Sequence, residues 1–298
     1  MAGTDRGATD EGTVWYTETL HEGYRASIEV RRTLFEGRSG QQHLVIAESV
    51  KFGTLVMLDG VTQLTSADEY VYHEMLSHPP ILAHGHVRDV LIVGGGDGAL
   101  AEEIFKHSGI EHITLVEIDP WVVGVSKRHL MDVNHGSFDD PRLELVIADG
   151  KDYVASTGAQ FDLIVVDSTD PSGPGEPLFE ESFYANCRRV LRPGGVIVTQ
   201  NGVPFFQAAE LEGTMRAFGR LFADSTCYLA AVPTYIGGFM AFGWGTDDPA
   251  LRQVPVATLV ERLAASGIAT RYYTPEVHLA SLALPRFILD IVERGREG

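Results

Sequence analysis

Between residues 14 and 65 the chain alternates apolar and polar positions and is interrupted by glycines. The clearest alternating segments are 24–37, 42–49 and 53–65, and the last contains Asp59-Gly60 between two apolar runs. A period of two is typical of strands with one buried face, and Asp-Gly between such runs predicts a tight hairpin. We therefore expect an antiparallel β-hairpin domain at residues 13–65. A domain of about 50 residues buries little core by itself, so it should pack on the rest of the chain or on a second subunit.

A helix should open a larger domain at residues 66–298. Ser66 stands three residues before Glu69, which is the spacing of a capping box, and a helix-forming segment continues to Pro79-Pro80. Proline lacks the backbone N–H of the helix and clashes with the preceding turn, so we expect the helix to stop before Pro79.

Apolar runs and helix-forming segments then alternate to the end of the chain. The apolar runs are 90–93, 113–117, 143–147, 161–167, 195–201, 225–232 and 237–245, and the clearest helices are about 179–191 and 255–266. Such alternation predicts the α/β class, with a doubly wound, mainly parallel sheet. Ligands of these sheets bind outside the carboxyl ends of the strands.

The stretch from Asp89 to Asp119 has the pattern of a nucleoside site. The apolar run at 90–93 ends in the glycine-rich turn 94–98, and the next strand ends at Glu117, roughly 20 positions further on. Glycines let the backbone approach a ligand closely, and an acidic residue at this spacing can accept hydrogen bonds from ribose hydroxyls. We therefore expect a βαβ unit that holds a nucleoside.

Composition narrows the possible partners. The formal net charge of −18 argues against nucleic acid and anionic membranes as partners, and it permits a cationic ligand. No apolar run is long enough to span a membrane, and the small polar residues 1–12 read as a flexible leader rather than a signal peptide. The only cysteines, Cys187 and Cys227, have neither disulfide nor metal-site spacing. We expect a cytoplasmic protein.

Histidine spacing gives no metal site. His73 and His78 are five positions apart, whereas two zinc ligands on one helix face are four apart. His84 and His86 flank Gly85 in an expected loop. We therefore expect no bound metal.

Carboxylates stand at the expected ends of successive strands. They are Asp97, Glu117 with Asp119, Asp149, and Asp167 with Asp170. A single such residue commonly caps a helix or forms a turn. A series of them on neighbouring strand ends repels unless a cation neutralises it, so this rim predicts a metal or an organic cation as ligand. The Pro- and Gly-rich loop after Asp167 is either a mobile lid or a long connection.

Six motifs along the chain carry a family resemblance. GGGDGA, VEID, ADG, DSTDPSGPGEPLF, DEYVYHEM and VPTYIGG closely resemble those of the spermidine synthase family of polyamine aminopropyltransferases, and the resemblance runs from about Trp15 to HLASLALP. It implies a Rossmann-like, methyltransferase-type sheet. It also implies transfer of an aminopropyl group from decarboxylated S-adenosylmethionine to a diamine such as putrescine, which gives spermidine and methylthioadenosine. The donor is a co-substrate, no cofactor is implied, and the assembly would be a homodimer or homotetramer.

The resemblance also implies roles for individual residues. Asp167 matches the catalytic aspartate, which would act as base toward the amine. Positions that match donor-binding residues are Gln42, Asp97, Glu117, Asp149, Gly150 and Pro174. Positions that match acceptor-binding residues are Gln63, Tyr72, His73, Asp170 and Tyr235.

Two positions depart from the family pattern. Glu102 stands where many relatives have arginine, and we expect it to alter the helix surface or an ion pair more than the chemistry. His73 stands where some relatives have glutamine, which bears on acceptor choice.

Other functions stay open at this point. Cadaverine, agmatine or a longer polyamine would serve as acceptor in the same chemistry. A methyltransferase would share the fold and the glycine turn, but Asp97 does not suit a zwitterionic donor. A nicotinamide oxidoreductase would fit G-x-G-x-x-A at Gly94, Gly96 and Ala99, yet Asp97 would face its pyrophosphate. A non-enzymatic binding module is disfavoured because Asp167, Asp170 and Tyr235 are all present.

Overall fold

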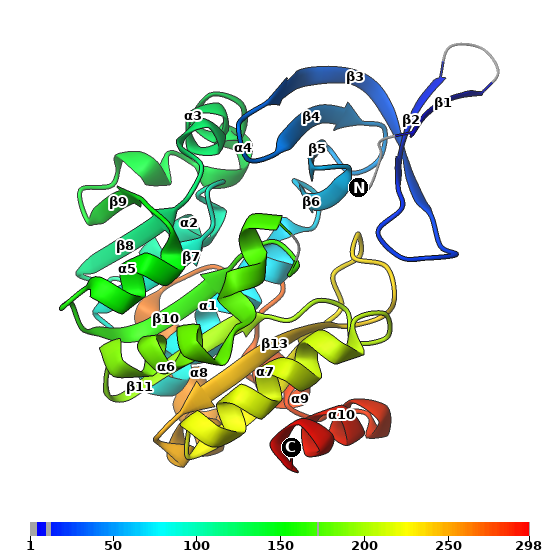
Figure 1. The fold of residues 1–298 in the computed structure, drawn as a ribbon. Coiled ribbons are helices and arrows are strands. Elements are labelled where there is room, and N and C mark those ends of the chain that lie inside the picture. Colours follow the sequence, from blue (N-terminus) through cyan, green and yellow to red (C-terminus); the bar gives the residue numbers. More distant parts are fainter. Residues whose placement is uncertain (1–4, 10–12, 172, 298) are drawn as a thin grey trace.

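The computed structural model describes residues 5–9, 13–171 and 173–297, and the side chains of residues 5–9, 13, 173 and 174 are outside this description. Within these residues the chain forms two sheets (Figure 1). The first is an antiparallel meander in the order β1 Asp5–Thr9, β2 Thr13–Glu18, β3 Ala26–Arg38, β4 His43–Ser49, β5 Thr54–Leu58 and β6 Val61–Thr65.

The second sheet has the order β12-β13-β11-β10-β7-β8-β9 in the described chain. Its strands are β7 Asp89–Gly94, β8 His112–Glu117, β9 Leu143–Ile147, β10 Phe161–Asp167, β11 Leu191–Gln200, β12 Asp224–Ala230 and β13 Met240–Thr246. All neighbouring pairs are parallel except those of β13, which runs antiparallel to β11 and β12. The prediction of a doubly wound, mainly parallel α/β sheet is confirmed.

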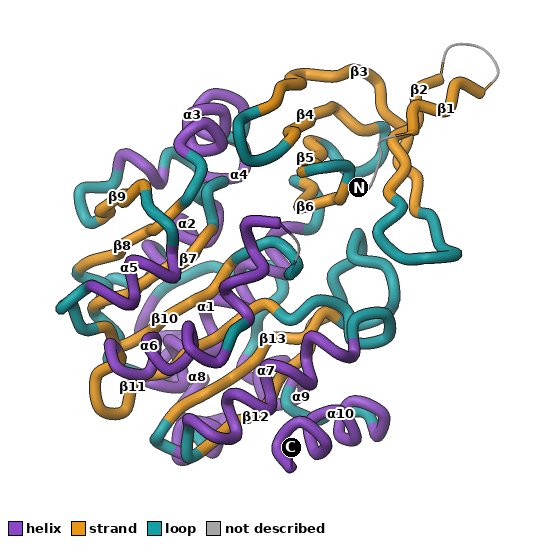
Figure 2. Tube along the Cα trace, in the orientation of Figure 1, coloured by secondary structure: helices purple, strands orange, loops and turns teal. Residues whose placement is uncertain are grey.

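Helices cover both faces of this sheet and join it to the first (Figure 2). They are α1 Glu69–His84, α2 Ala99–Phe105, α3 Pro120–His129, α4 Met131–Asn134, α5 Gly150–Ser156, α6 Glu181–Val190, α7 Ala208–Leu221, α8 Val256–Ser266, α9 Pro275–Ser281 and α10 Arg286–Glu297. Short 3-10 helices are η1 Ser137–Asp139, η2 Gly173–Phe179 and η3 Pro249–Gln253. The helices expected near 179–191 and 255–266 are α6 and α8.

The hairpin expected at Asp59-Gly60 is present. Leu58 pairs with Val61, and both turn residues have positive φ, 48° for Asp59 and 83° for Gly60. Two positive φ values in a two-residue loop match the twist of the flanking strands, and Asp-Gly tolerates them. Residues 1–12 were predicted to be a flexible leader. Within them, Asp5–Thr9 instead forms strand β1, which pairs with β2.

The start of α1 differs from the predicted capping box. The helix begins at Glu69 with Asp68 as N-cap, and no side chain caps it. The Ser66 hydroxyl instead accepts a hydrogen bond from the Thr54 backbone N–H, 2.9 Å away. The Ser66 hydroxyl, which the sequence pattern assigns to the start of α1, is therefore bound to strand β5 of the first sheet.

The prediction that α1 stops before Pro79 is wrong. Pro79 and Pro80 lie inside the helix, which continues to His84 and ends on Gly85 in the left-handed region, at φ 81°. Proline at position 79 leaves the carbonyl of Met75 without its helical donor. The buried Tyr228 hydroxyl on β12 donates to that oxygen at 2.7 Å, so a distant strand replaces the missing hydrogen bond.

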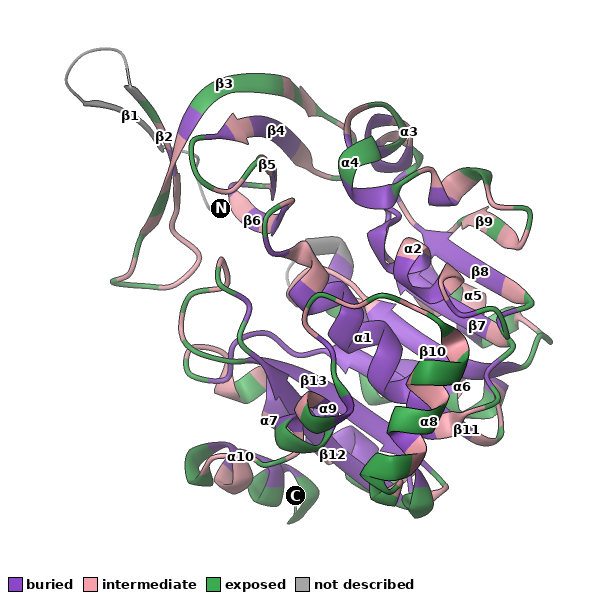
Figure 3. Cartoon of the chain, turned by 180° about the vertical axis from the view of Figure 1, so that it is seen from behind, coloured by how far each residue is buried: buried purple, intermediate pink, exposed green. Residues whose placement is uncertain are grey.

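Four apolar cores lie among the described residues, and one of them, around Val45 and Leu55, is within the first sheet. The other three hold the layers together. One lies on the α1 and α8 face of the large sheet, and one on the face covered by α6, α7 and α10. Figure 3 shows the central strands and most of α1 buried between these layers. A third core joins Leu44, Ile46 and Val56 of the first sheet to Val125 and Val133. The N-terminal sheet therefore packs on α3 and α4, as its small size predicts.

The proposed domain boundary at residues 65 and 66 stays a prediction; β6 ends at Thr65 and α1 begins at Glu69. In the described part of the chain no helix combines the length and the apolar character needed to cross a membrane.

Candidate active site

A cavity of about 210 Å³ lies at the carboxyl ends of β7, β8 and β10, under the first sheet. Predicted site residues that line it are Gln42, Gln63, Tyr72, His73, Asp97, Glu117, Asp149, Gly150, Asp167, Asp170 and Tyr235. Pro174 belongs to η2, and its side chain falls outside the described residues. Asp119, expected at the same rim, instead caps α3 by accepting from the Trp121 N–H at 3.0 Å.

The glycine turn fits tightly against two neighbouring strand ends. The Gly95 N–H donates to the backbone oxygen of Asp167 at 2.9 Å. A Cβ on Gly94 would lie 2.1 Å from that same oxygen, and one on Gly96 would lie 2.8 Å from Oε2 of Glu117. A side chain at either glycine would push Asp167 or Glu117 out of place. The turn thus positions two of the predicted site carboxylates.

Carboxylates line the part of the cavity that holds the predicted donor-binding positions. One oxygen of Asp97 accepts from the Ala99 N–H at 2.8 Å, which fixes the side chain at the start of α2. Glu117 accepts from the Asp119 N–H at 2.9 Å. Burial raises the pKa of Glu117 to about 7, although backbone hydrogen bonds oppose the shift. Donors such as ribose hydroxyls would stabilise its ionised form. Asp149 caps α5 through the Lys151 N–H at 2.7 Å.

Ser39 joins the loop that carries Gln42 to Asp119, which lies close to Glu117. The Ser39 hydroxyl donates to Oδ2 of Asp119 at 2.5 Å. It accepts from the N–H groups of Gln41 at 3.0 Å and Gln42 at 3.1 Å. Because Asp119 follows Glu117 closely on the chain, this hydroxyl couples the N-terminal sheet to the predicted ribose site. Sequence reasoning missed Ser39.

Asp167 and Tyr72 form the centre of the cavity. The Tyr72 hydroxyl donates to Oδ1 of Asp167 at 2.7 Å. Burial and the charge of Asp97 raise the pKa of Asp167 to about 6, against the charge of His73 and the Tyr72 hydrogen bond. Tyr235 packs edge-on against Tyr72 with ring centroids 5.8 Å apart, and its hydroxyl donates to the Gln63 carbonyl. These contacts hold a carboxylate with a proton affinity suited to general base chemistry.

His73 is a buried cation in this acidic cavity. It is 2% exposed, and its Nδ1 lies 2.8 Å from Oε2 of Glu69. Burial acts to lower the pKa of His73, but the Glu69 hydrogen bond and the charges of Asp97 and Asp167 raise it to about 9. The imidazolium therefore balances the two carboxylates when no cationic ligand is present.

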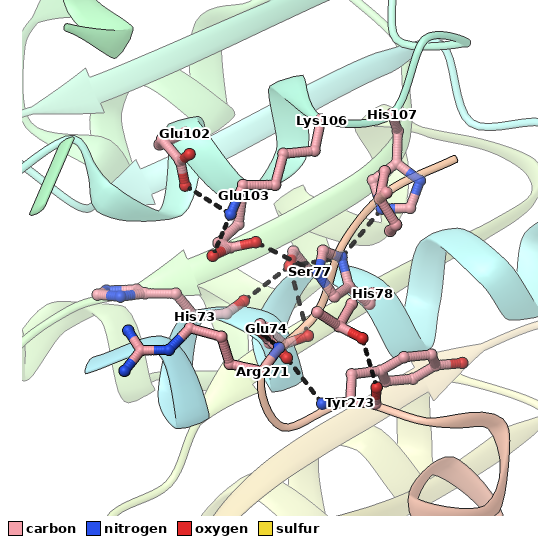
Figure 4. A network of polar contacts seen from close by, with 12 residues as sticks. His73, Glu74, Ser77, His78, Glu102, Glu103, Lys106, His107, Arg271 and Tyr273 are labelled. Atoms are coloured by element: carbon pink, nitrogen blue, oxygen red, sulfur yellow. Dashed lines mark hydrogen bonds and ion pairs between the residues drawn. The ribbon is translucent and has the colours of Figure 1, made fainter. Parts of the chain in front are cut away.

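A buried polar network fixes α1 behind these residues (Figure 4). Glu74, 1% exposed, accepts from the backbone N–H groups of Arg271, Tyr272 and Tyr273 at 2.6, 2.9 and 2.7 Å. His78 contacts His107 at 3.0 Å between ring nitrogens and lies 3.2 Å from Glu103. The helix is thus joined to the C-terminal segment and to α2, so Tyr72 and His73 stand on a braced element.

Glu102 takes part in an ion pair outside the cavity. It lies 3.0 Å from Lys106, which also binds Glu103 at 2.6 Å. This agrees with the expectation that Glu102 affects the surface of α2. Across the described residues no cluster of three or more His, Cys, Asp or Glu side chains has the arrangement of a metal site.

Several cavity residues were missed by sequence reasoning. Glu18, His21, Gln200 and Gln207 line the cavity together with the predicted residues. Gln200 ends β11, so the rule that ligands bind at carboxyl ends would have found it. His21 and Gln207 lie in connections that gave no periodic signal. The whole set makes an acidic cavity with Asp167 at its centre, an arrangement suited to cationic ligands and to proton removal.

Comparison with known families covers most of the chain. Residues 69–254 match the spermine/spermidine synthase domain, and residues 14–66 match the spermidine synthase tetramerisation domain. Polyamine aminopropyltransferase 1 of Pseudomonas aeruginosa is 53% identical over 277 residues, which are 93% of this chain and 97% of that protein. Polyamine aminopropyltransferase of Ruegeria is 51% identical over 275 residues, 92% of this chain and 97% of that protein.

Comparison with solved structures finds spermidine synthases as well. A spermidine synthase crystallised with the transition state analogue AdoDATO superposes with a TM-score of 0.90 at 33% identity, over 97% of this chain and 98% of that one. Spermidine synthase from Thermotoga maritima gives a TM-score of 0.87 at 31% identity, over 97% of each chain.

Proposed function

We propose a donor and an acceptor from the premise that this chain belongs to the spermine/spermidine synthase family and is a polyamine aminopropyltransferase. The proposed donor is decarboxylated S-adenosylmethionine, and the proposed acceptor is putrescine. The products would be spermidine and methylthioadenosine. The observation that carries the proposal is the placement of Asp97, Asp167 and Asp170 along one buried cavity, which suits two cations placed end to end.

Asp167 is the proposed base. A diamine arrives as an ammonium, because a free alkylamine of the lysine type has a pKa near ~10.4. A carboxylate oxygen of Asp167 takes one proton from it, and the freed nitrogen lone pair attacks the donor methylene carbon next to sulfur. The carbon–sulfur bond breaks with its electron pair moving to sulfur, which gives a neutral thioether and a secondary ammonium. The Tyr72 hydrogen bond at 2.7 Å supports this role by orienting the carboxylate.

Asp97 is the proposed donor selector. Decarboxylation removes the anionic end of S-adenosylmethionine and leaves an ammonium and a sulfonium. Asp97 attracts that ammonium, whereas it repels the carboxylate of ordinary S-adenosylmethionine, which disfavours methyl transfer. Glu117 would bind the ribose, Asp149 with Gly150 would face the adenine, and Gln42 would be a further donor-binding residue. The sulfonium is itself a good leaving group, so we propose that no cofactor is needed.

The acceptor would lie between the aromatic pair Tyr72 and Tyr235 and the carboxylate of Asp170, with Gln63 and His73 beside it. This arrangement accommodates a dication whose near nitrogen reaches Asp167. Cadaverine and agmatine differ from putrescine in length and in their far ends, so they are the alternative acceptors.

We also propose a homotetramer or homodimer and a cytoplasmic location. The match of residues 14–66 to the tetramerisation domain supports self-association, and both cysteines, Cys187 and Cys227, are buried and unpaired, as is usual in reducing compartments.

The function is tested by incubating the protein with decarboxylated S-adenosylmethionine and, separately, putrescine, cadaverine and agmatine. Mass spectrometry of the amine products should identify spermidine as the main product at equal acceptor concentrations. A preference for cadaverine or agmatine would replace the acceptor and leave the chemistry intact. No aminopropyl product with any of the three would refute the proposal.

A further inference from the structure

The acceptor end of the cavity contains a side chain that the proposed reaction does not yet use. Gln207 lines the cavity beside Asp170 and just before α7. Its Oε1 accepts from the Val203 N–H at 2.8 Å. Its Nε2 lies 3.2 Å from each carboxylate oxygen of Glu210. Gln207 and Asp170 line the cavity together, and a side-chain interaction with Gln207 acts to lower the pKa of Asp170. The carboxamide is therefore held on the backbone and placed between two carboxylates.

Gly202 makes the space for this arrangement. A Cβ on Gly202 would lie 2.5 Å from Oε1 of Gln207, and the glycine has φ 62°. Neighbouring Gln200 is 3% exposed, lines the same cavity and accepts from the Gly202 N–H at 3.0 Å. Among the described residues its Nε2 has no hydrogen-bond partner, so a buried polar atom is left for a ligand or water.

The charges at this end favour a cation. Burial raises the pKa of Asp170, and burial together with the charge of Asp170 raises the pKa of Glu210 to about 8. The charge of His21 opposes the first shift, and the His21 ring stacks on Phe206 with 4.3 Å between ring centroids. Tyr235 also faces Asp170, whose charge raises the pKa of that phenol. Two carboxylates near one amide are costly unless a positive charge joins them.

We propose that Gln207, braced by Val203 and Glu210 in the space left by Gly202, fixes the position of Asp170 and so selects the length of the diamine. The inference rests on the proposed function. The near nitrogen must reach Asp167 while the far ammonium pairs with Asp170. A rigid Asp170 leaves the far charge of a shorter or longer diamine poorly paired, and that mismatch discriminates between lengths. Gln207 is thus a positioning residue for acceptor choice.

The test compares wild type, Gln207→Ala and Glu210→Gln with diamines of three, four and five carbons and a fixed saturating donor. In Gln207→Ala the KM of the preferred diamine should rise about tenfold, the value of a lost hydrogen bond to a charged group, with kcat nearly unchanged. The ratio of kcat/KM between the preferred and the next diamine should fall by about the same factor. Glu210→Gln should also raise the KM of the preferred diamine and lower the ratio of kcat/KM values, each by a smaller factor than Gln207→Ala.

A matched control and a folding readout accompany these variants. Glu212→Gln removes a charge from the same helix, where Glu212 binds Arg216 and Arg294, and its acceptor ratios should equal those of wild type. Methylthioadenosine affinity should stay at the wild-type value in every variant, which shows that the fold and the donor site are intact. The isosteric Glu210→Gln variant keeps the test decisive if Gln207→Ala lowers Tm.

Two failures are distinguishable. If wild type transfers to a diamine and both variants keep its length ratios, or lose activity equally on all three diamines, the role of Gln207 is refuted and the proposed function stands. If wild type transfers aminopropyl to none of the diamines, the proposed function is refuted and this inference with it.

Discussion

At the scale of single residues, the cavity holds like charges close together, and the groups around them set the pKa of the buried Asp167. The charge of Asp97 raises the cost of ionising the buried Asp167, and the His73 imidazolium offsets part of that cost. In the proposed reaction a cationic substrate would supply the missing positive charge. The same charges would then both attract the substrate and set the proton affinity of the proposed base.

Replacing Asp167 by asparagine tests the base directly. The amide cannot accept the proton from the ammonium, so kcat should fall roughly 10²- to 10⁴-fold, the usual share of general base catalysis. Methylthioadenosine binding, followed by calorimetry, should stay close to wild type because the donor contacts remain. Asp152→Asn, an exposed change in α5, serves as the control. Retention of more than about half of wild-type kcat would remove Asp167 from this role.

The pH profile reports on the same carboxylate. The pKa of Asp167 is about 6 in the folded protein, and the base must be ionised, so kcat/KM for the acceptor should be level above pH 6 and fall as pH drops through 6. The Tyr72 hydrogen bond lowers this pKa, so Tyr72→Phe should move the acid limb to higher pH. An acid limb that stays in place in Tyr72→Phe would contradict the assignment.

At the scale of elements, the site depends on two attachments between parts of the chain. One is the loop before β4, which Ser39 ties to Asp119. The other is α1, which carries Tyr72 and His73 and is fixed through Glu74. Each attachment places side chains without touching a substrate. Changes there should alter binding or stability more than chemistry.

Ser39→Ala removes a hydroxyl with hydrogen bonds to Asp119 and to the loop that bears Gln42. The KM for the donor should rise about tenfold, with the acceptor KM and kcat nearly unchanged, because a charge-assisted hydrogen bond is lost. Ser39→Thr should restore the donor KM. Ser27→Ala, which removes an exposed hydroxyl on β3, is the control. Equal rises in the KM of both substrates would argue against a donor-specific role.

Glu74→Ala should lower the free energy of unfolding by about 3 kcal/mol or more, because three backbone donors lose a buried acceptor. Urea denaturation with a fluorescence readout measures this. Glu111→Ala removes a carboxylate from an exposed pair with Arg88 and should cost below about 1 kcal/mol. A Glu74→Ala loss no larger than that of Glu111→Ala would show that α1 is held by its apolar face alone.

At the scale of the whole molecule, local patterns predicted the elements, and distant contacts decided where those patterns failed. The strands at 143–147 and 161–167 were predicted with the bounds that β9 and β10 have, since their apolar runs end in clear turn residues. The end of α1 was wrong because Tyr228, on a strand far along the chain, replaces the hydrogen bond lost at Pro79. No local pattern contains that information.

In the candidate site, too, some residues were predictable from local patterns and others depend on contacts between distant parts of the chain. Carboxylates at strand ends were predictable, because parallel strands bring their carboxyl ends to one edge. His21 and Gln207 reach the cavity from connections between elements, where neither periodicity nor spacing marks them. Ser39 lies in another such connection and binds Asp119. Their contribution depends on how the N-terminal sheet lies over the larger one, which only the assembled fold defines.

The proposed activity of this acidic cavity is transfer of the aminopropyl group of decarboxylated S-adenosylmethionine. The most direct measurement gives the protein equal concentrations of decarboxylated and ordinary S-adenosylmethionine with putrescine, and identifies the nucleoside and amine products by mass. Methylthioadenosine and spermidine are the expected products, with no S-adenosylhomocysteine above the enzyme-free control. Formation of S-adenosylhomocysteine and a methylated amine, without spermidine, would contradict it.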